Sequence, residues 1–183
     1  MSTSFDGLIS KVKECGQKTV SVAVAQDSAV LEAVRAAKDR GIANAVLVGD
    51  EEKIKAVAAK DGIDISDFEI IHEPDEWTAA LTAGKLAHDG KVDMYMKGLL
   101  ETKTFLKSIL DKEVGLRTGN PLSHVCVFDI PGIDQLLFFT DVAFMTYPSL
   151  EDKVHIIENT VEVAHACGIA NPKVAPLAAV EVV

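Results

Sequence analysis

The stretch TVSVAVAQDSAVLEAVRAAKDRGIANAVLVG, residues 19–49, decides the fold of this chain. It opens with a β-branched apolar run at 19–25 and closes with a second apolar run, NAVLVG, at 44–49. Between them the sequence predicts a helix over 29–40, which Gly41 ends. Two continuous apolar runs joined by a helix are typical of parallel strands that are buried on both faces of a sheet.

The same alternation continues to residue 96. The further elements expected are strands at 68–72 and 92–96 and helices at 5–15, 51–61 and 76–88. Asp27 and Asp50 stand where a helix begins, and their carboxylates are expected to accept hydrogen bonds from the first turns. The pattern therefore predicts an α/β fold, a parallel sheet in an αβα sandwich.

The pattern changes after residue 119. Apolar runs at 125–130 and 135–140 flank a Pro131-Gly132 turn, which predicts a β-hairpin. A helix is expected at 150–167, with Ser149 and Asp152 spaced as a capping box, and a further strand at 174–183. We expect a first α/β domain at 1–145 and the beginning of a second domain at 146–183.

Composition limits the class of protein. The chain has 183 residues, of which 48% are apolar and 25% charged, and its net charge is −10. This is a soluble globular composition, and its acidic balance argues against a nucleic-acid partner, which favours a basic face. No apolar run is long enough to cross a bilayer, so no membrane partner is expected.

The cysteine and histidine residues show no metal-ligand spacing. Cys15, Cys126 and Cys167 are widely separated, and no CxxC pair occurs. Reduced intracellular thiols are the simplest interpretation. The first residues lack the basic-then-apolar pattern of an export signal. We therefore expect a cytoplasmic protein without a metal site.

The segment 96–124 is basic within an acidic chain. It holds five Lys or Arg and three Asp or Glu, so its net charge is +2 and that of the remainder is −12. It leaves the carboxyl end of an expected strand, where parallel sheets bind ligands. The segment offers ammonium, guanidinium and hydroxyl groups to an anion, and a glycine that permits close approach of the backbone. The candidate anion-binding residues are Lys97, Gly98, Thr102, Lys103, Thr104, Lys107 and Arg117. The alternative for each charged residue is an ordinary solvated position.

The usual nucleotide-binding motifs are absent. The expected first strand is followed by VAQDSA instead of a GxGxxG fingerprint, and no Walker spacing occurs. A dinucleotide or P-loop site is therefore not expected.

Four blocks in order, MKGLLETKTFLKSIL, LRTGNPLSHVCVFDIPG, LLFFTDVAF and PKVAPLAAVEVV, resemble the phosphate acetyl/butyryl transferases, and more closely their butyryl branch. The resemblance runs from about residue 20 to the end. It implies acyl transfer between coenzyme A and inorganic phosphate, with coenzyme A as substrate and no other cofactor. It also implies a sandwich related to that of isocitrate and isopropylmalate dehydrogenases, and a homo-oligomer.

The chemistry implied by the resemblance needs donors for an oxyanion and for a leaving phosphate, and a base for the thiol. His124 is a candidate catalytic base or donor, and Ser123 beside it a candidate phosphate ligand. Asp141 is a candidate for orienting the thiol or binding a ribose hydroxyl. The alternatives are a histidine bonded to a nearby carbonyl and an aspartate that caps a turn. At Lys107, acetyl-type relatives carry an arginine, so bidentate recognition is in doubt.

Chains of the family continue beyond this length, so the resemblance implies an amino-terminal portion whose usual general base lies elsewhere. On that hypothesis the chain alone folds poorly or binds ligand without turnover. The alternatives left open are a non-catalytic anion- or coenzyme A-binding fragment, a phosphate acetyltransferase, a transferase domain fused to another catalytic module, and a decarboxylating dehydrogenase.

Overall fold

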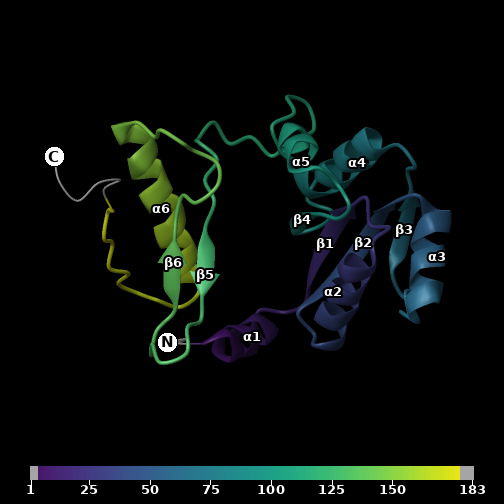
Figure 1. The fold of residues 1–183 in the computed structure, drawn as a ribbon, viewed down its shortest axis with the longest axis horizontal. Coiled ribbons are helices and arrows are strands. Elements are labelled where there is room, and N and C mark those ends of the chain that lie inside the picture. The colour runs from purple at the N-terminus through teal and green to yellow at the C-terminus, as the bar shows by residue number, and fades with distance from the viewer. Residues whose placement is uncertain (1–3, 178–183) are drawn as a thin grey trace. The chain divides into compact units, whose positions relative to one another are not determined.

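The computed structural model describes residues 4–177. The chain divides into one compact unit of residues 12–118 and another that joins the residues before 12 to those from 119 onward (Figure 1). The division after residue 118 differs from the domain boundary at 145/146 suggested by the sequence. The residues before the hairpin belong with the last helix, because the Asn159 amide donates to Ser123 Oγ at 2.9 Å.

The unit of residues 12–118 holds a four-stranded parallel sheet in the order β3-β2-β1-β4. The strands are β1 (Lys18–Ala23), β2 (Ala43–Gly49), β3 (Glu69–His72) and β4 (Met94–Lys97). The predicted α/β class and parallel sheet are confirmed. The first strand is shorter than expected, because Val24 adopts a φ of 56° and leaves the extended conformation.

Three helices alternate with these strands as the sequence predicts: α2 (Ser28–Asp39), α3 (Glu51–Asp61) and α4 (Glu76–His88). A further helix, α5 (Thr102–Ile109), follows β4. Asp27 accepts a hydrogen bond from Val30 N, and Asp50 accepts one from Lys53 N, so both predicted N-caps are confirmed. Each carboxylate satisfies an amide that the helix itself leaves unpaired.

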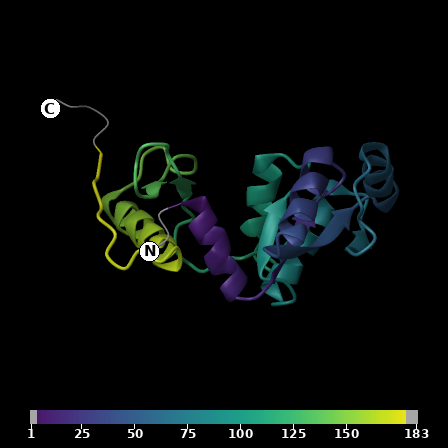
Figure 2. The ribbon, with the colours of Figure 1, turned by 90° about the horizontal axis from the view of Figure 1, so that it is seen from below.

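The strand side chains divide between two cores, one on each face of the sheet. Figure 2 shows the ribbon of these strands with the helices around them. Val22 and Leu47 point to the face covered by α2 and α3, where Leu31 and Ile54 pack against them. The intervening strand residues, such as Val48, point to the face covered by the alanines of α4. This two-sided burial explains why the strands are apolar without alternation.

The second unit contains an antiparallel hairpin and a long helix. β5 (Cys126–Phe128) pairs with β6 (Leu137–Phe139), as predicted. α6 (Leu150–Ala166) begins with the predicted capping box of Ser149 and Asp152. The structure assigns no strand to residues 174–177 of the expected last strand, since no neighbouring strand pairs with them, and 178–183 lie outside the described residues.

The first helix, α1 (Phe5–Glu14), precedes the sheet, also as predicted. The Phe5 amide at the start of α1 donates to Asp129 in the hairpin loop, and the Lys11 ammonium, in the second half of α1, donates to the Ala166 carbonyl at the end of α6. None of the helices within residues 4–177 is long and apolar enough to cross a membrane.

Candidate functional site

The order of strands in the sheet reverses at β1 and β4. The chain moves from β1 outward to β2 and β3, then returns to the other side of β1 with β4. At the end of β4, Gly98 N donates to Ala23 O at 2.7 Å and Leu99 N donates to Val24 O at 2.8 Å. Open α/β sheets bind ligands at the carboxyl ends of the strands where the order reverses. Lys97 and Gly98, predicted from sequence, therefore lie where the topology favours a site.

Gly98 is required by this close approach. A Cβ at residue 98 would lie 2.4 Å from Val24 O and 2.9 Å from Ala23 O, both backbone atoms. The facing residue, Val24, is buried and has a φ of 56°, which is strained for a β-branched side chain. Hydrogen bonds between the ends of β1 and β4 thus hold the backbone at this point, and they fix the position of the Lys97 backbone.

We expect Gly98→Ala to lower the free energy of unfolding by about 1–3 kcal/mol, because the methyl group must displace backbone that is paired on both sides. Gly84→Ala is the matched control. A Cβ at residue 84, inside α4, would meet only the Tyr95 ring at 3.6 Å, an ordinary contact. In a helix interior, alanine is favoured over glycine by about 1 kcal/mol. Urea denaturation should therefore show opposite signs, and equal effects of the two changes would contradict this account.

The cations and hydroxyls of the basic segment are mostly exposed. Lys97 donates to the Leu100 carbonyl at 3.0 Å. Thr102 is the first residue of α5, and the N-cap of that helix, Glu101, makes no side-chain capping bond. Thr102 and Lys103 are exposed, whereas Thr104 is half-buried. The first turn of α5 therefore presents amide, hydroxyl and ammonium groups together, all suited to an anion.

Lys107 has a partner that the sequence does not reveal. Its ammonium lies 4.4 Å from the centre of the Trp77 ring, near the start of α4. Such cation–π contacts contribute about 0.5–1 kcal/mol at exposed sites. An anion that draws Lys107 to itself must offset this contact, so the structure favours Lys103 over Lys107 as a ready anion ligand.

Arg117 lies exposed in the loop after α5. A His88 ring nitrogen, Nδ1, is 2.9 Å from the Gly115 carbonyl and ties this loop to the end of α4. Asp111 accepts hydrogen bonds from Val114 N and Glu113 N, and these bonds hold the pKa of its carboxyl below the usual value. His88 is a functional-site neighbour missed by the sequence, which offered only an unassigned histidine at a helix end.

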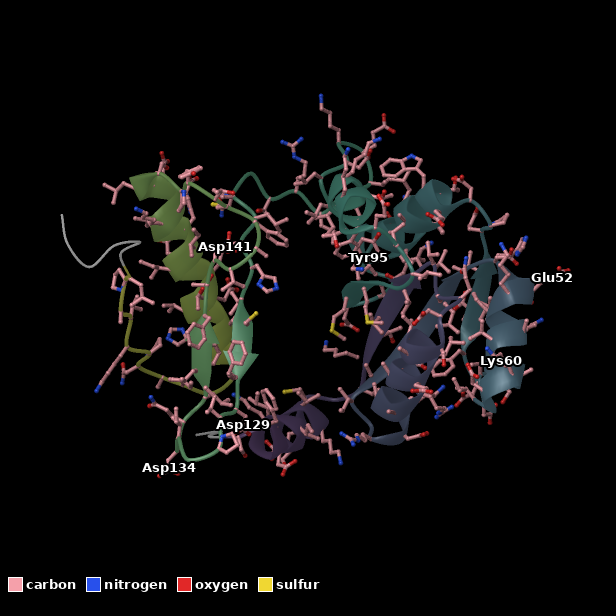
Figure 3. All side chains as sticks on the ribbon, viewed as in Figure 1. Glu52, Lys60, Tyr95, Asp129, Asp134 and Asp141 are labelled. Carbon is pink, nitrogen blue, oxygen red and sulfur yellow. The ribbon has the colours of Figure 1, made fainter. Side chains whose placement is uncertain are left out.

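Ser123, His124 and Asp141 belong to the unit that contains the hairpin, which we call the hairpin unit. Figure 3 labels Asp141 in this unit. Ser123 accepts a hydrogen bond from Asn159 of α6, a residue that the sequence did not single out. His124 Nδ1 lies 3.6 Å from Cys126 Sγ, and its ring packs edge-on against Phe144. The structure thus groups the predicted site residues as seven in one unit and three in the other.

The Asp141 carboxylate accepts hydrogen bonds from four backbone amides. Its Oδ1 accepts from His124 N, Ala143 N and Phe144 N, and its Oδ2 accepts from Met145 N at 2.7 Å. Partial burial alone would raise the pKa of this carboxyl, but the four backbone donors outweigh it and hold the pKa below the usual value. These contacts favour the alternative of a turn-capping aspartate over direct chemistry on a substrate.

A pair of hydroxyl groups, Tyr95 and Ser108, joins β4 to α5 beneath the surface of the basic segment. The Tyr95 hydroxyl on β4 donates to Ala80 O at 3.0 Å and lies 2.8 Å from Ser108 Oγ on α5. Burial raises the pKa of Tyr95, so the phenol stays protonated. A tyrosine between two methionines of β4 is the sequence signal for this network, because a buried phenol needs a hydrogen-bond partner.

No group of three or more His, Cys, Asp or Glu residues that could hold a metal ion occurs within residues 4–177. The side chains that gather after β4 are mainly ammonium and hydroxyl groups, which suit an anionic ligand better than a cation.

Comparison with known proteins agrees with these features. The chain is 58% identical over all 183 residues to the phosphate butyryltransferase of Clostridium acetobutylicum, and 35% identical over 181 residues to the phosphate acetyltransferase of Rhizobium meliloti. It spans 61% and 57% of the length of these relatives.

Two solved structures share the fold. The first is a branched-chain phosphotransacylase from Enterococcus faecalis V583, with a TM-score of 0.67 and 26% sequence identity. The match covers 81% of this chain and 51% of the phosphotransacylase chain. The second is a phosphotransacetylase from Streptococcus pyogenes, with a TM-score of 0.75. The match covers 91% of this chain and 60% of the phosphotransacetylase chain, and at 18% sequence identity it supports the fold alone. The model of the phosphate acetyl/butaryl transferase family matches residues 4–79 and 73–183, and the chain belongs to this family.

Proposed function

We propose that this chain is part of a phosphate acyltransferase that transfers a short acyl group, butyryl in preference to acetyl, between coenzyme A and inorganic phosphate. The observation that carries the proposal is the basic segment after β4, which lies at the reversal of strand order within a chain of net charge −10. The preference for butyryl rests on the higher identity to the butyryltransferase than to the acetyltransferase.

The basic segment supplies the electrostatics that this reaction needs. Attack of the coenzyme A thiol on an acyl phosphate forms a tetrahedral oxyanion and releases a multiply charged phosphate. In this proposal the first turn of α5 and Lys103 bind the phosphate, and Lys97 adds charge at the end of β4. Lys107 and Arg117 join when the anion draws their side chains in. A lysine in place of an arginine contributes a point charge without a bidentate fork.

The other candidate groups lie in the hairpin unit. There His124 remains the candidate base or proton donor, and Ser123 the candidate phosphate ligand. Asp141 holds the loop that follows β6 and fixes the His124 amide, so we assign it a positioning role. Coenzyme A and phosphate as substrates without a further cofactor, a homo-oligomeric assembly and a cytoplasmic location remain parts of this proposal.

The proposal is tested by phosphate-dependent thiol release from butyryl-CoA, with acetyl-CoA alongside. Lys103→Met is expected to lower kcat/KM for phosphate about tenfold or more, because it removes one fixed cation from the developing charge. Lys112→Met is the control, since Lys112 is also exposed but lies in the loop after α5.

Faster release from butyryl-CoA in the presence of phosphate supports the proposal. Coenzyme A binding in calorimetry without turnover favours the non-catalytic alternative. Release that ignores phosphate, or equal rates for the two lysine variants, contradicts the roles assigned to the basic segment.

A further inference from the structure

The proposed reaction does not use Cys126, a half-buried thiol on β5. Its Sγ lies 3.6 Å from His124 Nδ1, within hydrogen-bond reach for sulfur. His124 comes two residues before Cys126, the first residue of β5, so the contact is local in the sequence. A thiol beside an imidazole is a nucleophile with its base already in place.

His124 is held by hydrogen bonds of its backbone and by a contact of its ring with Phe144. The His124 backbone N–H donates to Asp141, and the His124 carbonyl accepts from Thr140 Oγ1 at 2.9 Å. The ring itself packs edge-on against Phe144, with 5.5 Å between ring centres. The main-chain bonds thus hold the backbone of residue 124, the packing against Phe144 restrains its ring, and in this arrangement Nδ1 lies beside Cys126.

The other two cysteines have different surroundings. Cys167 ends α6, and burial raises the pKa of its thiol, which lowers the thiolate fraction at neutral pH. Cys15 is exposed and lies near Lys18. Among the described residues neither thiol lies within hydrogen-bond distance of an imidazole. Cys126 is thus the thiol in the described part of the chain with a base beside it.

We propose that Cys126 is a site of covalent thiol modification, which forms a mixed disulfide with small-molecule disulfides. The Cys126 proton passes to His124 Nδ1, and the thiolate attacks one sulfur of the disulfide. The S–S bond breaks, and the departing thiolate takes the proton from His124. Cys126 is oxidised to the mixed disulfide, and one thiol is released for each disulfide consumed.

The test uses the full 183-residue chain and glutathione disulfide as the probe. Trypsin places each cysteine on a separate peptide, with Cys126 on residues 118–153, Cys15 on 14–18 and Cys167 on 154–173. Peptide mass spectrometry at successive times then gives the rate of adduct formation at each thiol within one sample. We expect the Cys126 adduct to form first, although Cys15 is the more exposed thiol.

His124→Gln is the decisive variant, and it should slow the Cys126 adduct about tenfold or more, because it removes the base. The two bonds that hold residue 124 come from its backbone, so glutamine retains them, and circular dichroism checks the fold. His155→Gln is the control, because the His155 ring contacts Glu158 and not a thiol. A Cys126 rate that is below that of Cys15, or that is unchanged in His124→Gln, overturns the proposal.

Discussion

Asp141→Ala is expected to lower the free energy of unfolding of the hairpin unit by about 2–4 kcal/mol. The carboxylate accepts hydrogen bonds from four backbone amides, and bonds to a charged acceptor contribute about 1.5–3 kcal/mol each when buried. Residue 141 is only half-buried, so water satisfies some of these amides in the variant, and the sum falls well below four full bonds.

Amide hydrogen exchange measures this effect at the affected groups. Protection at His124 and at residues 143–145 should fall in Asp141→Ala, because these amides lose their acceptor. Asp134→Ala is the matched control, since Asp134 is an exposed residue in the turn of the same hairpin (Figure 3). Unchanged protection at residues 143–145 in the Asp141 variant would show that the carboxylate does not hold this loop.

The same residue gives a pH dependence with a definite sign. The pKa of Asp141 is lower in the folded chain than in the unfolded chain, so folding favours the ionised form. The contribution of Asp141 to the free energy of unfolding is fully present above the pKa that it has in the unfolded chain. This contribution is lost as the pH falls through the pKa that Asp141 has in the folded chain. Asp141→Ala should therefore show a smaller loss of stability on acidification than the parent chain, measured by urea denaturation at pH values from neutral to about 3.

Leu47→Ala is expected to destabilise the unit of residues 12–118 by about 2–5 kcal/mol, the range for a buried leucine whose cavity relaxes only partly. Leu47 is 0% exposed at the centre of β2, packed among Val22, Leu31 and Ile54. These neighbours come from a strand and two helices of the sandwich, so the cavity cannot close by moving one element.

Trp77, the one tryptophan of the chain, lies in the same unit, and its emission in urea measures the change. The control is Leu99→Ala, which removes a leucine that is 57% exposed and should stay within about 0.5 kcal/mol of the parent. Equal effects at residues 47 and 99 would mean that the two-sided core does not dominate the stability of this unit.

The sequence by itself determined the α/β class, the elements before residue 98 to within about two residues, and the helix caps at Asp27, Asp50 and Ser149. These features follow from local physics. Apolar runs such as 44–49 fit only strands buried on both faces, and Asp27, Asp50 and Ser149 satisfy amides within three residues of themselves. The location of the basic segment at a strand end also followed, because Lys97 directly succeeds an apolar run.

Only the tertiary structure decided which groups meet across the fold. The return of β4 to the side of β1 is a long-range pairing, and it sets the close approach at Gly98. The contact of Lys107 with Trp77 joins two helices, and the hydrogen bond from His124 N to Asp141 joins residues 17 apart. Local pattern cannot predict such contacts, because they depend on side-chain rotamers and on how separate elements pack.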